Sequence, residues 1–142
     1  MTIATILASR SGEVVRVAAD DRVADVVTLL AERRIGAVPV MDGNQVVGIF
    51  SERDVIHGLA ARGGAMLHQP VGDFMTAPAI TVRPGEAVLG ALSLMTRRRI
   101  RHLPVVDGAQ LVGFVSIGDL VKYRIDRIEA EADAMREYIQ SA

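Results

Sequence analysis

The chain has 142 residues, of which 50% are hydrophobic and 23% are charged, and its formal net charge is −1 at pH 7. This composition is typical of a globular domain, and it excludes a global basic field that would attract nucleic acid. The absence of cysteine excludes disulfides and thiolate chemistry, and it fits a reducing compartment.

Residues 1–10 have neither the basic region nor the long apolar core of a secretion signal. No run in the sequence approaches the ~20 apolar residues of a membrane-spanning helix. We therefore expect a cytoplasmic protein without membrane contact. Residues 1–9 instead predict a short helix, and Ser11-Gly12 predicts a turn after it.

Residues 14–64 predict a strand, a helix, a hairpin and a second helix. The strand is the β-rich run at residues 14–17, and Asp20 or Asp21 can cap the helix that follows it. Four apolar residues of that helix share one face: Val23, Val26, Val27 and Leu30. This spacing is typical of a helix packed on a core.

A hairpin comes next in the chain. Residues 38–41 and 46–50 are two apolar β-type runs, and Asp42-Gly43-Asn44 between them is a strong hairpin signal. Ser51 then begins a second helix, which Gly63-Gly64 ends. The unit therefore has the order β-α-β-β-α.

The same unit occurs again later in the sequence. A shift of 65 residues places Ile100 on Ile35 and Asp119 on Asp54 without a gap. Residues 65–78 connect the copies. A fixed period over this length indicates duplication. Neither copy has enough strands to cover its own helices, so we expect an α+β fold in which two small sheets pack about a pseudo-twofold axis.

The second copy follows the order of the first. Its strand is expected at residues 80–82, a turn at Pro84-Gly85, and a hairpin over Asp107-Gly108. The inward face of its first helix consists of Val88, Ala91, Leu92 and Met95.

The chain ends in one polar-rich helix with an apolar seam. The seam residues recur at alternating steps of four and three: Val121, Ile125, Ile128, Ala132, Met135 and Ile139. Two interpretations remain open. The helix either folds back on its own domain or forms a dimer contact, and the seam is shorter than the ~3–4 heptads expected of a coiled coil.

Both copies contain the pattern Gly-x-x-Ser-x-x-Asp between a strand and a helix. The glycine would let a ligand approach the strand end, and a serine at a helix N-terminus lies where free N–H groups favour an anion. The aspartate could accept hydrogen bonds from both hydroxyls of a ribose. Together these features indicate a nucleotide.

A simpler interpretation exists for the same residues. A serine followed three positions later by an acid is nearly a capping box, which would explain Ser51 with Asp54 and Ser116 with Asp119 without any ligand. The motif alone does not separate the two interpretations.

The whole pattern, however, is more specific than the motif. The doubled unit, with Val-Pro-Val or Leu-Pro-Val, then Asp-Gly, Val-Gly and Ser-x-x-Asp, resembles the CBS domain, named after cystathionine β-synthase, as a tandem pair. Stand-alone bacterial CBS-pair proteins with a trailing helix look closest. The resemblance implies repeats at residues 1–68, with the N-terminal helix leading into the first repeat, and 69–124, and a helical extension at 125–142.

The resemblance also implies ligand-binding residues. In this family the Ser-x-x-Asp of one repeat faces the first strand and the x-x-Pro-Val strand of the other. The first cleft would combine Ser51, Glu52, Arg53, Asp54, Thr76, Ile80, Arg101 and His102. The second would combine Ser116, Asp119, Val15, Gly36 and Ala37. Glu52 and Arg53 would act through their backbone N–H groups, because their side chains are expected to face solvent.

The two clefts differ in charge. Arg101 and His102 suit a phosphate through charge-assisted hydrogen bonds, whereas Gly36 and Ala37 at the equivalent place offer no positive charge. We expect the first cleft to prefer phosphorylated ligands and the second to be weaker, empty, or specific for an uncharged nucleoside. Arg101 could instead belong to the solvated basic run Arg97-Arg98-Arg99.

These expectations favour a regulatory module that binds an adenosine nucleotide, such as AMP, ADP, ATP or NAD, and acts in trans as an energy or metabolite sensor. We expect a homodimer with a further, unnamed protein partner. The alternative is a ligand-free dimerisation scaffold.

An enzyme and a nucleic-acid-binding protein fit less well. His57, His68 and His102 do not have a metal-ligand spacing, and no set of nucleophile, base and orienting residue is evident. The run at 97–99 could contact phosphates, but the chain offers only two tyrosines and three phenylalanines for stacking. We therefore expect no catalysis, no metal and no nucleic acid.

Overall fold

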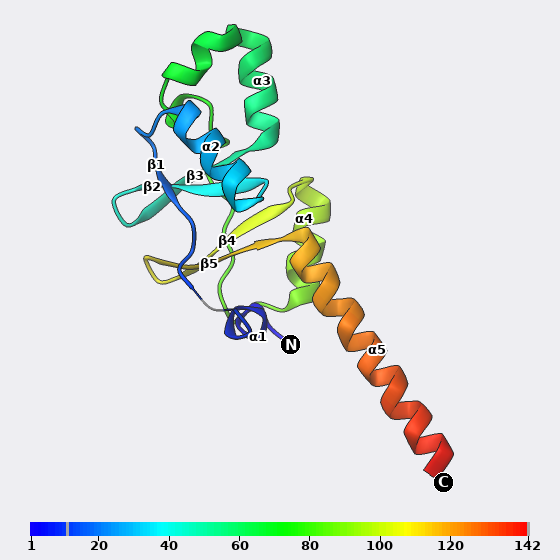
Figure 1. Cartoon of the computed structure of the whole chain (residues 1–142). Coiled ribbons are helices and arrows are strands. Elements are labelled where there is room, and N and C mark those ends of the chain that lie inside the picture. Colours follow the sequence, from blue (N-terminus) through cyan, green and yellow to red (C-terminus); the bar gives the residue numbers. More distant parts are fainter. Residues whose placement is uncertain (11, 142) are drawn as a thin grey trace.

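The computed structural model describes residues 1–10 and 12–141, so Ser11 and the turn expected there lie outside the described residues. Two similar halves lie against each other, and a long helix leaves the body at one end (Figure 1). The elements in chain order are α1 (Ile3–Ala8), β1 (Val17–Ala18), α2 (Val23–Arg33), β2 (Ala37–Asp42), β3 (Gln45–Ser51), α3 (Glu52–Arg62), the 3-10 helices η1 (Gly63–His68) and η2 (Val71–Asp73), α4 (Val88–Arg98), β4 (His102–Asp107), β5 (Gln110–Ser116) and α5 (Ile117–Ser141).

The sheets repeat down to their irregularities. In the first half β1 is parallel to β2, which pairs antiparallel with β3. In the second half β4 and β5 form the matching antiparallel pair. The register shifts between Val40 and Met41 in one sheet and between Val105 and Val106 in the other, which are equivalent positions. The α+β fold of two related repeats is therefore confirmed.

Both first strands are shorter than the sequence indicates. Residues 14–16 lie outside β1, and of residues 80–82 only Val82 pairs, in an isolated parallel bridge with Val105. A strand that pairs on one side along two residues or fewer gains few ladder hydrogen bonds, so the β-rich composition of the runs is not enough to extend it.

Neither Asp20 nor Asp21 caps α2, contrary to expectation. The N-cap is Arg22 and makes no side-chain cap hydrogen bond. Asp21 instead accepts a 2.9 Å hydrogen bond from the backbone of Ala18. The N–H of Val23 donates to the carbonyl of Gln69 at 2.9 Å, so the connecting segment satisfies one of the free donors at the start of α2.

Each half has its own hydrophobic core. The buried residues of the first core are Val17, Val23, Val26, Leu30, Val38, Val40, Phe50, Met66 and Val71. Those of the second core are Ile3, Ile6, Val82, Val88, Ala91, Met95, Leu103, Val105, Val115 and Leu120. The apolar faces predicted for α2 and α4 point into these cores.

The segments that precede the two repeats are exchanged. Helix α1 precedes the first repeat in sequence, yet Ile3 and Ile6 lie in the second core. The connecting segment precedes the second repeat, yet Met66 and Val71 lie in the first core. Each repeat is therefore completed by chain that leads into the other, and this exchange binds the two halves together.

Only the beginning of α5 packs on the body. Leu120 is fully buried, whereas residues 125–141 are all exposed. Figure 1 shows the helix running straight away from both halves. The interpretation in which the helix folds back on its own domain is therefore wrong.

Candidate functional site

Two cavities lie between the repeats, one for each Ser-x-x-Asp. We call them the Asp54 cleft, of about 490 Å³, and the Asp119 cleft, of about 550 Å³. Both are composite, because each combines the Ser-x-x-Asp of one repeat with the strand start of the other. Gly36 and His102 line both clefts and so mark where the two meet. Volumes of this size suit a ligand of nucleotide dimensions.

The structure brings most of the predicted residues together. The Asp54 cleft is lined by Ser51, Glu52, Arg53, Asp54, Thr76, Arg101 and His102. The Asp119 cleft is lined by Ser116, Asp119, Val15, Gly36 and Ala37. Ile80 is the exception, because it packs against the second core and is not among the residues that line either cleft. In this run only Val82 pairs, in a single bridge with Val105, so no strand holds residue 80 on the cleft wall.

Asp54 is held in a capping box at the start of α3. Its Oδ2 accepts from the backbone N–H of Ser51 at 2.9 Å, and the hydroxyl of Ser51 accepts from the N–H of Asp54 at 3.4 Å. Its Oδ1 accepts from the hydroxyl of Thr76 at 3.0 Å. The capping interpretation is thus correct for this pair, and it coexists with a position on the cleft wall.

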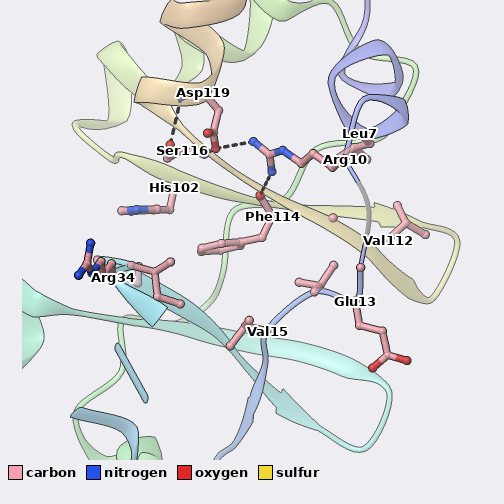
Figure 2. Close-up of a pocket in the computed structure, with 16 residues that line it drawn as sticks. Leu7, Arg10, Glu13, Val15, Arg34, His102, Val112, Phe114, Ser116 and Asp119 are labelled. Atoms are coloured by element: carbon pink, nitrogen blue, oxygen red, sulfur yellow. Dashed lines mark hydrogen bonds and ion pairs between the residues drawn. The ribbon is translucent and has the colours of Figure 1, made fainter. Parts of the chain in front are cut away.

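Asp119 has the same cap and an added cation. Its Oδ2 accepts from the backbone N–H of Ser116 at 2.7 Å, and its own N–H donates to the hydroxyl of Ser116 at 3.1 Å. The guanidinium of Arg10 lies 2.7 Å from the same carboxylate oxygen. Arg10 also donates to the carbonyl of Phe114 at 2.8 Å, and Figure 2 shows its side chain spanning the two.

These partners determine the charge of Asp119. Burial alone would raise the pKa of its carboxyl group. The hydrogen bonds from Ser116 and Arg10, together with the positive charge of Arg10, outweigh burial, so the pKa lies below its ordinary value of 3.8. Asp119 is ionised at pH 7, and its charge is already paired.

His102 stacks on Phe114 in the wall of the Asp119 cleft. The ring centroids are 5.5 Å apart and the planes are inclined by 9° (Figure 2). Burial lowers the pKa of His102 below 6.5, and the nearby charge of Arg101 lowers it further, whereas Asp119 and Glu52 raise it in part. At pH 7 the ring is therefore mostly neutral, and the positive charge beside it belongs to Arg101.

Gly36 and Ala37 carry no charge, but other residues bring positive charge to the second cleft, which we did not predict from the sequence. Arg10 and Arg34 both line the Asp119 cleft. Arg34 is the C-cap of α2 and has a φ of 54°, and its equivalent Arg99 is the C-cap of α4 with a φ of 55°. Arg99 lines the Asp54 cleft, so each cleft receives one arginine from a helix end of the opposite repeat. The 65-residue shift, which aligns these two arginines, was the signal that could have revealed them.

Two other local expectations also change. The N–H of Glu52 donates to the carbonyl of Gly36 at 3.0 Å, so it is already used within the protein. At Gly48 a β-carbon would lie 2.8 Å from the carbonyl oxygen of Thr76, and at Gly113 it would lie 2.5 Å from a methyl group of Leu7. The motif glycines therefore make room for the protein's own chain rather than for a ligand.

Within residues 1–10 and 12–141, no three His, Cys, Asp or Glu side chains gather into a group that could hold a metal ion. Nor does any helix in the part of the chain that the structure describes combine the length and the apolar character needed to cross a membrane.

Comparison with protein families identifies both halves. The model of the CBS domain matches residues 7–61 and again residues 71–126. The chain belongs to the CBS domain family. Both matched segments contain a Ser-x-x-Asp and a Pro-Val strand, so the two clefts described above lie between two CBS domains.

Known CBS proteins share this architecture. A CBS domain-containing mitochondrial protein of Arabidopsis thaliana, CBSX3, is 39% identical over 126 residues, which cover 85% of this chain and 61% of the relative. The structure of a protein with CBS domains from Burkholderia ambifaria matches this chain with a TM-score of 0.83 and 38% identity. The match covers 89% of this chain and 95% of that protein. The chain thus spans less than two thirds of the Arabidopsis relative.

One solved CBS structure contains a nucleotide. The CBS domain protein PAE2072 from Pyrobaculum aerophilum, described as complexed with AMP, is 28% identical, with a TM-score of 0.73. The match covers 84% of this chain and 89% of that protein.

Proposed function

We propose that this CBS pair is a regulatory module that binds an adenosine nucleotide, AMP, ADP, ATP or NAD, and acts on a protein partner in trans, without catalysis of its own. The observation that carries the proposal is the composite Asp54 cleft, which is lined by Asp54 from one repeat and by Arg99 and Arg101 from the other. The AMP complex of PAE2072 supports the ligand class. We place the module in the cytoplasm as a homodimer.

The Asp54 cleft is the stronger candidate for a phosphorylated nucleotide. Arg99 and Arg101 both line it, and its carboxylate accepts hydrogen bonds from hydroxyl and amide groups rather than from a guanidinium. In the Asp119 cleft a ligand would have to displace Arg10 from the carboxylate, at the cost of a 2.7 Å ion pair. The sequence led to the same preference from Arg101 and His102 alone, without taking into account Arg10 and Arg34 in the second cleft.

The proposed mechanism follows from the composite walls. A ligand that contacts both repeats stabilises the relative orientation in which both sets of contacts form. The equilibrium moves by no more than the difference in affinity between orientations. A protein partner would respond to that change of orientation.

Calorimetric titration with AMP, ADP, ATP and NAD tests the proposal. At least one should bind, and at 100 times its dissociation constant it should raise the free energy of unfolding by ~2.7 kcal/mol. Asp54→Asn keeps an acceptor for the Ser51 N–H but loses one charged oxygen, so we expect affinity to fall about tenfold or more. Asp107→Asn, at the exposed last residue of β4 and outside both clefts, is the matched control and should bind as the wild type does.

A ligand-free dimerisation scaffold is the second candidate. It is favoured by the capping hydrogen bonds of both Ser-x-x-Asp motifs, which satisfy the serines and aspartates without a ligand. A flat response to all four nucleotides, with a stable dimer in light scattering, would favour the scaffold and contradict our proposal.

A further inference from the structure

The part of α5 beyond the body has an uncovered apolar face. Ile125 is 49% exposed, Ile128 48%, Met135 58% and Ile139 65%. With Val121 and Ala132 they form one stripe, which we call the α5 seam. Figure 1 shows that the helix stands clear of both repeats, so the body does not cover the seam. A face of this kind requires a partner or remains in contact with water.

The spacing of the seam residues indicates that the partner is another helix. Written as heptads, Ile125, Ala132 and Ile139 occupy the a positions, and Val121, Ile128 and Met135 occupy the d positions. This pattern matches an identical helix in the same register. The d positions hold valine, isoleucine and methionine rather than the leucine typical of two-stranded coils, so the number of strands is taken from the homodimer proposed above and not from the seam.

The charges beside the seam select the orientation. In a parallel pair, each g residue faces the e residue five positions later on the other helix. Arg124 at g then faces Glu129 of the second copy, and Glu131 at g faces Arg136 of the second copy. Both contacts are between opposite charges, and symmetry doubles them.

An antiparallel pair is disfavoured by the same residues. If Ile128 meets Ala132 of the second copy, e positions face e positions and g positions face g positions. Glu129 would face Glu129 of the second copy, and Glu131 would face Glu131 of the second copy. Juxtaposed like charges oppose that arrangement.

Two of the charges have partners within α5. Arg127 lies 3.4 Å from Glu131, and Arg136 lies 3.0 Å from Asp133. Exposed pairs of this kind are weak, so they can rearrange when a second helix arrives. The charges therefore determine orientation, and burial of the seam supplies the affinity.

We propose that residues 121–139 of two copies form a parallel, in-register, two-stranded coiled coil. The inference rests on the homodimer proposed above and does not depend on the nucleotide. The coil is short, so the dimer dissociates on dilution and dissociates more readily than longer coiled coils.

Cysteine cross-linking tests the orientation, because the chain has no cysteine of its own. In the parallel coil the cysteine of Met135→Cys lies opposite the same cysteine of the second copy, and the two form an intermolecular disulfide on mild oxidation. In the antiparallel pair the two sulfur-bearing positions would be ~15 Å apart along the helices, beyond the ~7 Å reach of a disulfide. Glu137→Cys, on the outer face of the helix, is the control and stays uncross-linked.

Seam substitution tests the surface itself. Ile128→Asp should abolish the dimer in light scattering at concentrations where the wild type is dimeric, whereas Ala130→Asp on the opposite face should leave it intact. Both positions are exposed and lie beyond the body, so neither change disturbs a core. A dimer that survives Ile128→Asp, or that shows no Met135→Cys cross-link, overturns the coiled coil but not the homodimer. A wild-type monomer overturns both, and nucleotide binding is measured separately.

Discussion

Arg34 and Arg99 have a backbone conformation that is unfavourable for a residue with a side chain. Both are C-caps with φ near 55°, in the left-handed region that glycine adopts most readily at helix ends. A side chain in this region costs on the order of 1 kcal/mol. Both arginines line clefts. Conformational strain at a cleft points to a role for the side chain there.

Replacing Arg99 by glycine should separate stability from binding. We expect Arg99→Gly to raise the free energy of unfolding by up to ~1 kcal/mol, because the strain is relieved. The same change should lower the affinity for a phosphorylated nucleotide about tenfold, because a charge-assisted contact is lost. Urea unfolding and calorimetric titration measure the two effects.

The neighbouring arginine provides a control for this change. Arg98→Gly, in the last turn of α4 and outside both clefts, should destabilise the protein by ~1 kcal/mol without changing affinity. Equal affinity for Arg99→Gly and the wild type would show that Arg99 does not contact the ligand.

At the scale of elements, the hairpins β2–β3 and β4–β5 are equivalent, but different parts of the chain cover them. Over Gly48 lies the connecting segment, where Ile49 and Thr76 exchange backbone hydrogen bonds of 2.8 and 3.0 Å. Over Gly113 lies the end of the Leu7 side chain. Backbone held by two hydrogen bonds cannot move aside, whereas a leucine side chain can adopt another rotamer.

Alanine substitutions at the two glycines should therefore have unequal effects. We expect Gly48→Ala to lower the free energy of unfolding by ~1–3 kcal/mol, because the added methyl group meets a fixed carbonyl oxygen. Gly113→Ala should lower the free energy of unfolding clearly less than Gly48→Ala does, because the Leu7 side chain can move aside. Urea midpoints of the two variants provide the comparison, and a larger loss for Gly113→Ala would contradict this account.

At the scale of the whole molecule, the exchange of leading segments makes each repeat depend on the other. Helix α1 closes the second core although it is the first element of the chain. The backbone of Ile3 donates to Glu86 at 2.9 Å, and that of Val88 donates to Met1 at 3.2 Å. The N-terminus thus contributes to the helix start of α4 as well as to the core beneath it.

Truncation of Ile3 should act on the distant half of the sequence. Ile3 is fully buried, so Ile3→Ala is expected to cost ~2–5 kcal/mol. Amide hydrogen exchange should rise more at residues 102–116 than at residues 37–51, because the lost contacts belong to the second core. The reverse order of protection would show that α1 stabilises the first repeat instead.

Local pattern predicted much of this molecule and failed where distant segments meet. The apolar faces of α2 and α4 and the two hairpins follow from periodicity, turn residues and the repeat, whereas the composite clefts follow from the resemblance to the CBS family. The core that α1 joins, the capping of α2 by a distant carbonyl, and the pairing of Arg10 with Asp119 depend on contacts between segments far apart in sequence. No local period encodes such contacts.

One unbroken helix links the Asp119 cleft to the far end of the protein. Asp119 lies in the first turn of α5, and the same helix continues to Ser141. A rod of 25 residues is roughly 37 Å long, so a tilt of ~5° at its base displaces its tip by ~3 Å. An event that moves Arg10 away from Asp119 and tilts α5 would therefore produce its largest displacement at the C-terminal end of the helix, beyond the reach of a molecule bound in the cleft.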